Sequence, residues 1–217
     1  MLCHCAEKED NMNNKILKLT EDLFYGKGTH KKCYRHPEDS RKCIKMAYSA
    51  YGQKDLDREL AYLKILSTHG GDKSALPEYY GAVETTLGIG HVYEFITNYD
   101  GSPCKTLESF LDNEEILTEN YDMLRKELLN FKIYLLANRI ITMGLFPENI
   151  LFQKDGKGTY VIRLVNDMGS AALIPLEYYI GFIARIRINK RWNRFIQYLK
   201  SAYANSKMVL KLADDIK

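Results

Sequence analysis

The chain has 217 residues, of which 46% are hydrophobic and 12% aromatic, and its formal net charge is +3. A chain of this length suits one domain, or two small lobes that share a core, and it has ample apolar material for that core. The charge is too small to indicate nucleic-acid binding by itself, so no nucleic-acid partner is expected.

Cysteine usage and hydropathy predict a soluble, cytoplasmic protein. The five cysteines form no paired framework and their number is odd, which fits a reducing compartment. The N-terminus lacks a basic segment followed by an unbroken apolar run, which argues against a signal peptide. No stretch reaches the roughly 18 uncharged residues that a membrane span needs. Cys3-His4-Cys5 could contact a metal, but no second ligand cluster with zinc spacing follows, so no metal is expected there.

The N-terminal part predicts an antiparallel arrangement of strands and tight turns after a flexible segment, residues 1–14. The expected elements are a strand over 16–24, a glycine turn over 26–30, a strand over 32–34, a turn over 36–39 and a strand over 42–46. Gly26 and Gly28 remove side chains where a backbone can approach phosphates, and Lys45 would lie in mid-strand beneath them. A Gly-x-Gly pair alone is typical of ordinary hairpins, but here an apolar strand ending in Cys-Ile-Lys follows it.

Residues 54–67 have the spacing of an amphipathic helix. Its apolar side consists of Leu56, Leu60, Leu63 and Leu66. Glu59 lies beside this stripe, where it either reaches inward to Lys45 or forms a surface pair with Arg58 or Lys64.

A second hairpin is expected from a strand over 79–86, a turn over 87–90 and a strand over 91–96. The chain then passes through 97–101 towards a helix that begins near Thr106. We expect an adenine ring to meet backbone groups around Glu94 and Ile96, although a plain hairpin exit would have the same sequence.

The stretch 140–151 follows a helix predicted over 121–138 and reads as a tight loop that delivers Asn149 to the start of a strand. A short hairpin then leads to Asp167-Met168-Gly169. Hard oxygen ligands of this kind, few in number, suit a nucleotide-bound Mg²⁺. Taken singly, Asn149 could be a loop cap and Asp167 a turn residue. Their combination with the glycine turn and Lys45 favours the nucleotide interpretation.

The C-terminal part predicts an amphipathic helix with a basic outer face. Its apolar positions are Phe182, Ile183, Ile186, Trp192, Phe195, Ile196 and Leu199, and its basic ones are Arg185, Arg187, Lys190, Arg191, Arg194 and Lys200. Such a helix either packs on the core or binds anionic lipid or acidic partners. We favour the first; contact with a membrane surface is the lesser alternative.

The loop and Asp167 resemble the protein-kinase-like fold, whose patterns are H-R-D-L-x-P-x-N-I-L and D-F-G. Gly144 falls where that family has its catalytic Asp, with Thr142 and Met143 in place of its His and Arg. The resemblance implies an α+β, two-lobed fold within one domain. It has an N-lobe with an antiparallel sheet over 15–98 and a reduced, mainly helical C-lobe over 99–217.

Several strings resemble a narrower group, the bacterial PhoP regulatory network protein YrbL family. They are the segments 26–34, 36–39, 42–45 and 79–85 and the Asp-Gly at 100–101. This resemblance implies a bacterial cytosolic protein linked to the PhoP response to low magnesium and envelope stress. The activity of the family is poorly defined.

The kinase-like resemblance also implies roles for individual residues. Lys45 would hold the α and β phosphates of ATP, Glu59 would orient Lys45, and Gly26 and Gly28 would cover the phosphates. The remaining pair, Asn149 and Asp167, would hold Mg²⁺.

No base is available at Gly144, and Glu148 should point away if Asn149 faces the metal. General-base help is worth about 10²–10⁴-fold, so slow transfer to an unidentified acceptor is conceivable without it. The alternatives are a pseudokinase that acts as a regulatory binding module, and a basic protein that associates with membranes or nucleic acid through residues 185–200.

Overall fold

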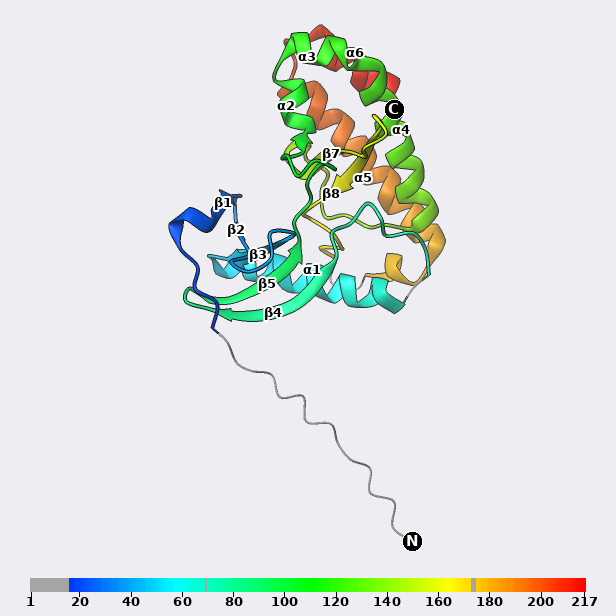
Figure 1. Ribbon diagram of the computed structural model, residues 1–217. Helices are drawn as coiled ribbons and strands as arrows, with labels where there is room; N and C mark the ends of the chain where they lie inside the picture. Colours follow the sequence, from blue (N-terminus) through cyan, green and yellow to red (C-terminus); the bar gives the residue numbers. More distant parts are fainter. Residues whose placement is uncertain (1–15, 69, 173–174) are drawn as a thin grey trace.

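The computed structural model describes residues 16–68, 70–172 and 175–217. The expectations for the first 14 residues and for Cys3-His4-Cys5 lie outside these ranges. Figure 1 shows a sheet with one helix at one end of the molecule and a group of helices at the other.

The N-terminal part is an antiparallel sheet of five strands in the order β1-β2-β3-β5-β4. The strands are β1 (Phe24–Lys27), β2 (Lys31–Arg35), β3 (Lys42–Ala47), β4 (Tyr79–Thr85) and β5 (Gly88–Glu94). The antiparallel sheet and the mixed α+β class are therefore confirmed. One face of this sheet packs on a small apolar cluster that includes Leu17, Tyr34 and Ile44.

The strand expected over 16–24 is wrong. Leu17 forms only an isolated bridge with Thr85, a 3₁₀ helix (η1, Glu21–Leu23) follows, and β1 begins at Phe24. Leu17 and Leu19 are nevertheless buried against the sheet. The alternation of apolar and polar residues thus indicates an extended segment that is buried on one side, and it does not require hydrogen bonding to a neighbouring strand.

Helix α1 (Ala50–Thr68) begins four residues earlier than expected and contacts β3. Its buried side consists of Gly52, Leu56, Glu59, Tyr62 and Leu66. A Cβ on Gly52 would lie 2.3 Å from the carbonyl oxygen of His30, so only glycine allows the helix to approach the β1–β2 turn this closely.

The rest of the chain is mainly helical around a second antiparallel sheet, ordered β6-β7-β8. Its strands are β6 (Lys105–Thr106), β7 (Ile150–Lys154) and β8 (Tyr160–Leu164). The helices are α2 (Leu107–Leu111), α3 (Glu114–Glu119), α4 (Tyr121–Asn138), α5 (Gly181–Ala202) and α6 (Lys207–Asp215), with 3₁₀ turns η2 (Pro147–Asn149) and η3 (Leu176–Tyr178). The prediction of a buried helix over 121–138 is confirmed, because α4 has these bounds and buries Leu124, Leu128, Phe131 and Leu135.

The amphipathic helix expected near the C-terminus is α5, but its apolar face differs from the expected one. Phe182 and Ile186 are 73% and 52% exposed. The buried face consists of Ala184, Ile188, Trp192, Phe195, Ile196 and Leu199 and belongs to the main core. The helix packs on the core, as favoured above, through the buried residues from Ala184 to Leu199.

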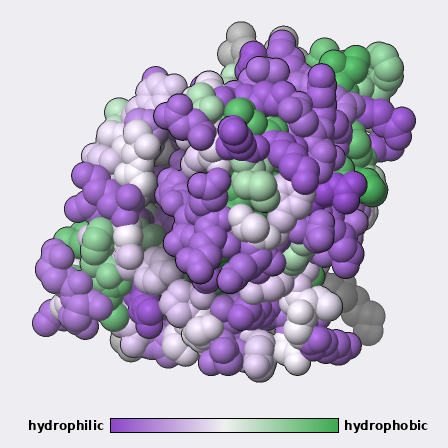
Figure 2. Space-filling model, turned by 90° about the horizontal axis from the view of Figure 1, so that it is seen from above, coloured by the Kyte–Doolittle hydropathy of each residue, from purple (hydrophilic) through white to green (hydrophobic). Residues whose placement is uncertain are grey.

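The surface carries many charged side chains. Figure 2 shows one face on which hydrophilic side chains predominate and hydrophobic ones form separate small areas. Within the described ranges, no helix is long and apolar enough to cross a membrane.

Candidate functional site

A cavity of about 610 Å³ lies between the two sheets. This volume is within the usual range for small-molecule sites. Its lining includes seven of the residues singled out in the sequence, namely Gly26, Gly28, Lys45, Glu94, Ile96, Asn149 and Asp167. Glu59 is fully buried and does not line it.

The glycine turn forms one wall of the cavity. Gly26 lies within β1 opposite Cys33, and the Gly28 amide donates to the Lys31 carbonyl at 2.9 Å to close the turn. A Cβ at Gly26 would meet no atom within 4 Å. Internal packing therefore does not require glycine at position 26.

Lys45 crosses the cavity to the segment that follows β8. Its Nζ donates to the carbonyl of Val165 and, at 3.0 Å, to Oδ1 of Asn166. The ammonium group also lies 4.5 Å from the ring centroid of Tyr93. Only 7% of Lys45 is exposed, so these contacts fix its position between the two sheets.

Glu59 points inward from α1, but its ion-pair partner is Lys31 rather than Lys45. Lys31 Nζ lies 3.0 Å from Glu59 Oε2, and the glutamate side chain is fully buried. Burial alone would raise the pKa of Glu59, but the positive charges of Lys45 and Lys31 outweigh it and hold the pKa below its usual value. Glu59 is thus an ionised, buried carboxylate that faces inward, and the alternative of a surface pair with Arg58 or Lys64 is not formed.

Two buried oxygens next to Lys45 lack hydrogen-bond partners within the described part of the chain. They are Oε1 of Glu59 and the hydroxyl of Tyr93. Burial and then the negative charge of Glu59 raise the pKa of Tyr93, so the two groups are neighbours although their geometry does not give a hydrogen bond. A buried acceptor that receives no hydrogen bond raises the free energy of the folded protein.

Asn149 and Asp167 meet at the floor of the cavity. Asn149 Nδ2 donates to Asp167 Oδ2 at 2.7 Å, and Asn166 Nδ2 donates to Asn149 Oδ1 at 2.9 Å. Asp167 has φ of 60°, a left-handed conformation that Asp adopts more readily than most residues. Its backbone carbonyl accepts from the Met143 amide at 2.6 Å, which holds the residue in place. Met168, the next residue, is fully buried in the core.

The chemistry of this pair fits a hard cation. Burial raises the pKa of Asp167, and the positive charge of Lys31 partly offsets this effect. Within the described residues, no group of three or more His, Cys, Asp or Glu side chains could hold a metal by itself. An amide–carboxylate pair leaves coordination positions for phosphate oxygens and water, as a nucleotide-bound Mg²⁺ needs.

The space beside Gly144, where the kinase pattern has its catalytic Asp, is filled by Phe146. A Cβ on Gly144 would lie 2.5 Å from Cε2 of the Phe146 ring. Phe146 lines the cavity and packs edge-on against Tyr198, with 5.9 Å between ring centroids. A hydrophobic ring thus takes the place of the proton acceptor.

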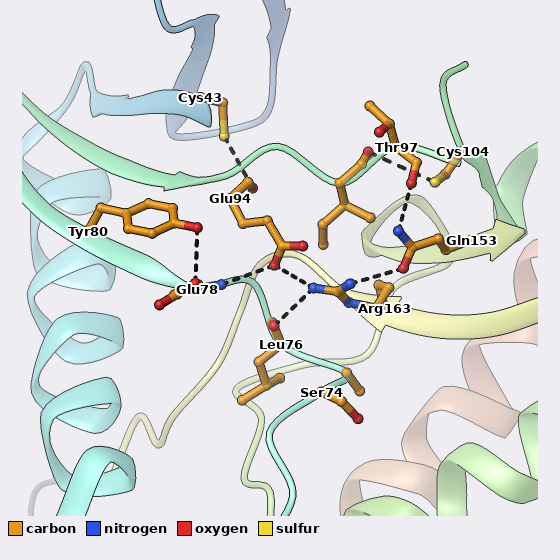
Figure 3. Close-up of polar contacts among 12 residues, drawn as sticks. Cys43, Ser74, Leu76, Glu78, Tyr80, Glu94, Thr97, Cys104, Gln153 and Arg163 are labelled. Atoms are coloured by element: carbon orange, nitrogen blue, oxygen red, sulfur yellow. Dashed lines mark hydrogen bonds and ion pairs between the residues drawn. The ribbon is translucent and has the colours of Figure 1, made fainter. Parts of the chain in front are cut away.

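Some of the backbone groups expected to meet an adenine already form hydrogen bonds within the protein. The amides of Glu94 and Phe95 donate to the carbonyls of Glu78 and Arg41 at 2.8 and 2.7 Å. The Glu94 carboxylate pairs with Arg163 at 2.5 Å, within the polar cluster drawn in Figure 3. Fewer backbone groups are therefore free for a base than the sequence suggested.

Sequence reasoning missed Lys31 and Asn166. The strand was expected to begin at residue 32, one position too late to include Lys31. The alternation of side chains along a strand could have identified Lys31. Lys31 lies on the same face as Cys33, and Cys33 is directly opposite Lys45. Nothing in the sequence indicated a role for Asn166 except its position directly before Asp167.

Comparison with known proteins gives a consistent match. The family model of PhoP regulatory network protein YrbL matches residues 17–200. Two similar relatives are the "Uncharacterized protein YrbL" of Escherichia coli (strain K12) and that of Shigella flexneri. Each is 37% identical over 183 residues, which cover 83% of this chain and 87% of the relative. The chain therefore belongs to the family of PhoP regulatory network protein YrbL.

Proposed function

We propose that this protein is a small, atypical kinase-like protein that binds ATP with Mg²⁺ in the cavity between its two sheets. The observation that carries the proposal is the convergence of Lys45, Asn149 and Asp167 on one cavity from different elements. A cation opposite an amide–carboxylate pair is what a metal-bound polyphosphate requires. The five-stranded sheet with α1 would be the N-lobe and the remainder the reduced C-lobe.

Each side chain has a role in this proposal. Gly26 and Gly28 present backbone to the phosphates, Asn149 and Asp167 offer oxygens to the metal, and Lys45 positions Asn166 and adds positive charge. Bound Mg²⁺ would neutralise charge on the phosphate oxygens. With Phe146 beside Gly144, no side chain at that position accepts a proton. Glu148, which was expected to point away, lines the cavity, so transfer to an unidentified acceptor would depend on positioning and charge unless Glu148 accepts the proton.

Calorimetric titration with ATP tests the proposal. The protein should bind ATP more tightly with Mg²⁺ than without it. Asp167→Asn should remove this Mg²⁺ dependence and weaken binding at least tenfold, because the substitution keeps the acceptor for Asn149 but removes the charge. Asp122→Asn, on the exposed face of α4, is the matched control and should bind as the wild type does. Equal binding by all three proteins would refute the metal–nucleotide site.

The second candidate function is a pseudokinase that binds nucleotide as a regulatory module. The ring of Phe146 beside Gly144 favours it, because the ring occupies the space that a proton-accepting side chain at position 144 would need. Incubation with γ-labelled ATP and Mg²⁺ separates the two candidates. Sustained phosphate release that is lost in Asp167→Asn supports a phosphotransferase, whereas binding without turnover supports the module.

The family description connects its members with the PhoP regulatory network. We infer the same regulatory setting for this chain. This inference concerns the regulation of the protein and does not identify a phosphate acceptor.

A further inference from the structure

We propose that Lys31 of β2 is the principal phosphate-binding cation of the cavity, and that Lys45 mainly positions the floor of the site. This inference rests on the proposed nucleotide function. It adds a phosphate-contacting residue on a strand where the kinase-like resemblance provides none.

Lys31 has the position that such a role needs. It is the first residue of β2, directly after the glycine turn, and it lines the cavity together with Gly28 and Asp167. Its side chain is 14% exposed, so the ammonium group is largely shielded from bulk water, where its attraction for a phosphate would be weak.

Lys31 is also held in place with donors to spare. An ammonium group has three donors, and among the residues that the structure describes Lys31 Nζ donates one hydrogen bond, to Glu59 Oε2 at 3.0 Å. The fully buried Glu59 fixes the lysine without using its remaining donors. A pre-positioned cation binds a phosphate with less loss of conformational freedom than a free lysine does.

Lys45 is committed elsewhere. Its ammonium group donates to Val165 and Asn166 and lies over the ring of Tyr93. Asn166 in turn donates to Asn149. Lys45 therefore acts through Asn166 on the residues that would hold the metal.

The lining of the cavity agrees with this division. Lys31 pairs with the Glu59 carboxylate and lines the cavity together with Asp167. A polyphosphate with its Mg²⁺ at Asp167 would pass close to this lysine.

Binding of ATP, ADP and adenosine to Lys31→Met, Lys31→Arg and Lys45→Met tests the inference. Lys31→Met should weaken Mg²⁺–ATP and ADP at least tenfold and leave adenosine unchanged, because only the phosphates lose a partner. Lys31→Arg should retain most of the affinity. Lys27→Met is the matched control: Lys27 is an exposed lysine of β1, next to the same turn but outside the cavity lining, and its variant should bind all three ligands normally.

Loss of Lys31 leaves Glu59 as an unpaired buried charge, which can disturb the fold. The double variant Lys31→Met/Glu59→Gln removes both charges and is compared with Glu59→Gln alone. Thermal denaturation should show that these two fold equally well, and the double variant should still bind ATP at least tenfold more weakly.

The outcomes separate the two proposals. If the wild type does not bind ATP, the proposed function fails and this inference fails with it. If the wild type binds ATP and both Lys31 variants retain its affinity, or if adenosine is weakened as much as ATP, only the role of Lys31 is overturned.

Discussion

At the scale of single residues, the most informative position is Gly144. Its φ is not in the left-handed region, so the backbone there would accept other residues. The obstacle is the Phe146 ring, which occupies the space of a side chain at 144. The sequence shows that position 144, where the kinase pattern has an Asp, is a glycine, but only the structure shows that an aromatic ring occupies the space beside it.

The substitution Gly144→Ala should destabilise the protein by about 1–3 kcal/mol, the usual range for overpacking, because the new Cβ would lie 2.5 Å from Phe146 Cε2. Phe146→Ala in the same chain should recover most of this loss by removing the ring. Urea denaturation of the two single variants and the double variant measures the coupling between these positions. Additive effects would show that the ring moves aside at no cost.

Lys45 and Glu59 show which features of the candidate site can be predicted from the sequence. The sequence places Lys45 in mid-strand and leaves Glu59 either facing inward or on the surface, and the structure buries both residues. The sequence could not identify their partners, because whether Glu59 meets Lys31 or Lys45 depends on how β2, β3 and α1 pack. In the structure the partner of Glu59 is Lys31, the first residue of β2.

At the scale of elements, long periodic segments were predicted best. Helix α4 has the predicted bounds because its apolar spacing continues for five turns without a break. The segment 16–24 and the first turn of α5 were predicted less well. In each case apolar residues follow a regular spacing, but the tertiary contacts needed to form the strand, or to bury Phe182, are missing.

Helix α5 is joined to the C-terminus through Trp192. Its indole Nε1 donates to the carbonyl of Ile216 at 2.9 Å, and both residues are fully buried. Trp192→Phe should lower the free energy of unfolding by roughly 1–3 kcal/mol, because it leaves a buried carbonyl without a donor.

Chemical denaturation measures this loss, with Phe182→Ala as the control on the same helix. Phe182 is 73% exposed, so its removal should change stability by no more than about 0.5 kcal/mol. Equal losses in the two variants would contradict the assignment of the buried face of α5.

At the scale of the whole molecule, a polar cluster around Arg163 connects the two sheets. The guanidinium group, on β8, contacts the Glu94 carboxylate at the end of β5, the Leu76 carbonyl at 3.2 Å and Gln153 Oε1 at 2.9 Å (Figure 3). Gln153 also donates to the carbonyl of Thr97 at 2.6 Å. Residues 76, 94 and 153 therefore meet at one side chain.

The substitution Arg163→Met should weaken the connection between the sheets. It removes three hydrogen bonds and leaves Glu94 partly buried without its cation, so we expect a loss of about 1–3 kcal/mol. Hydrogen exchange should accelerate most at the amides of residues 94 and 95. Arg125→Met is the control, because it breaks an exposed ion pair with Asp215 that contributes at most about 1 kcal/mol.

Lys45 spans the space between the two sheets and ends on the carbonyl of Val165. If a ligand in the cavity disturbs this contact, a shift of the two sheets must in turn change the affinity for that ligand. The filling of the cavity and the relative placement of the sheets are then thermodynamically linked, and each affects the other by the same coupling free energy. A sensor of relative sheet movement, such as a distance label on each sheet, would therefore report the filling of the cavity.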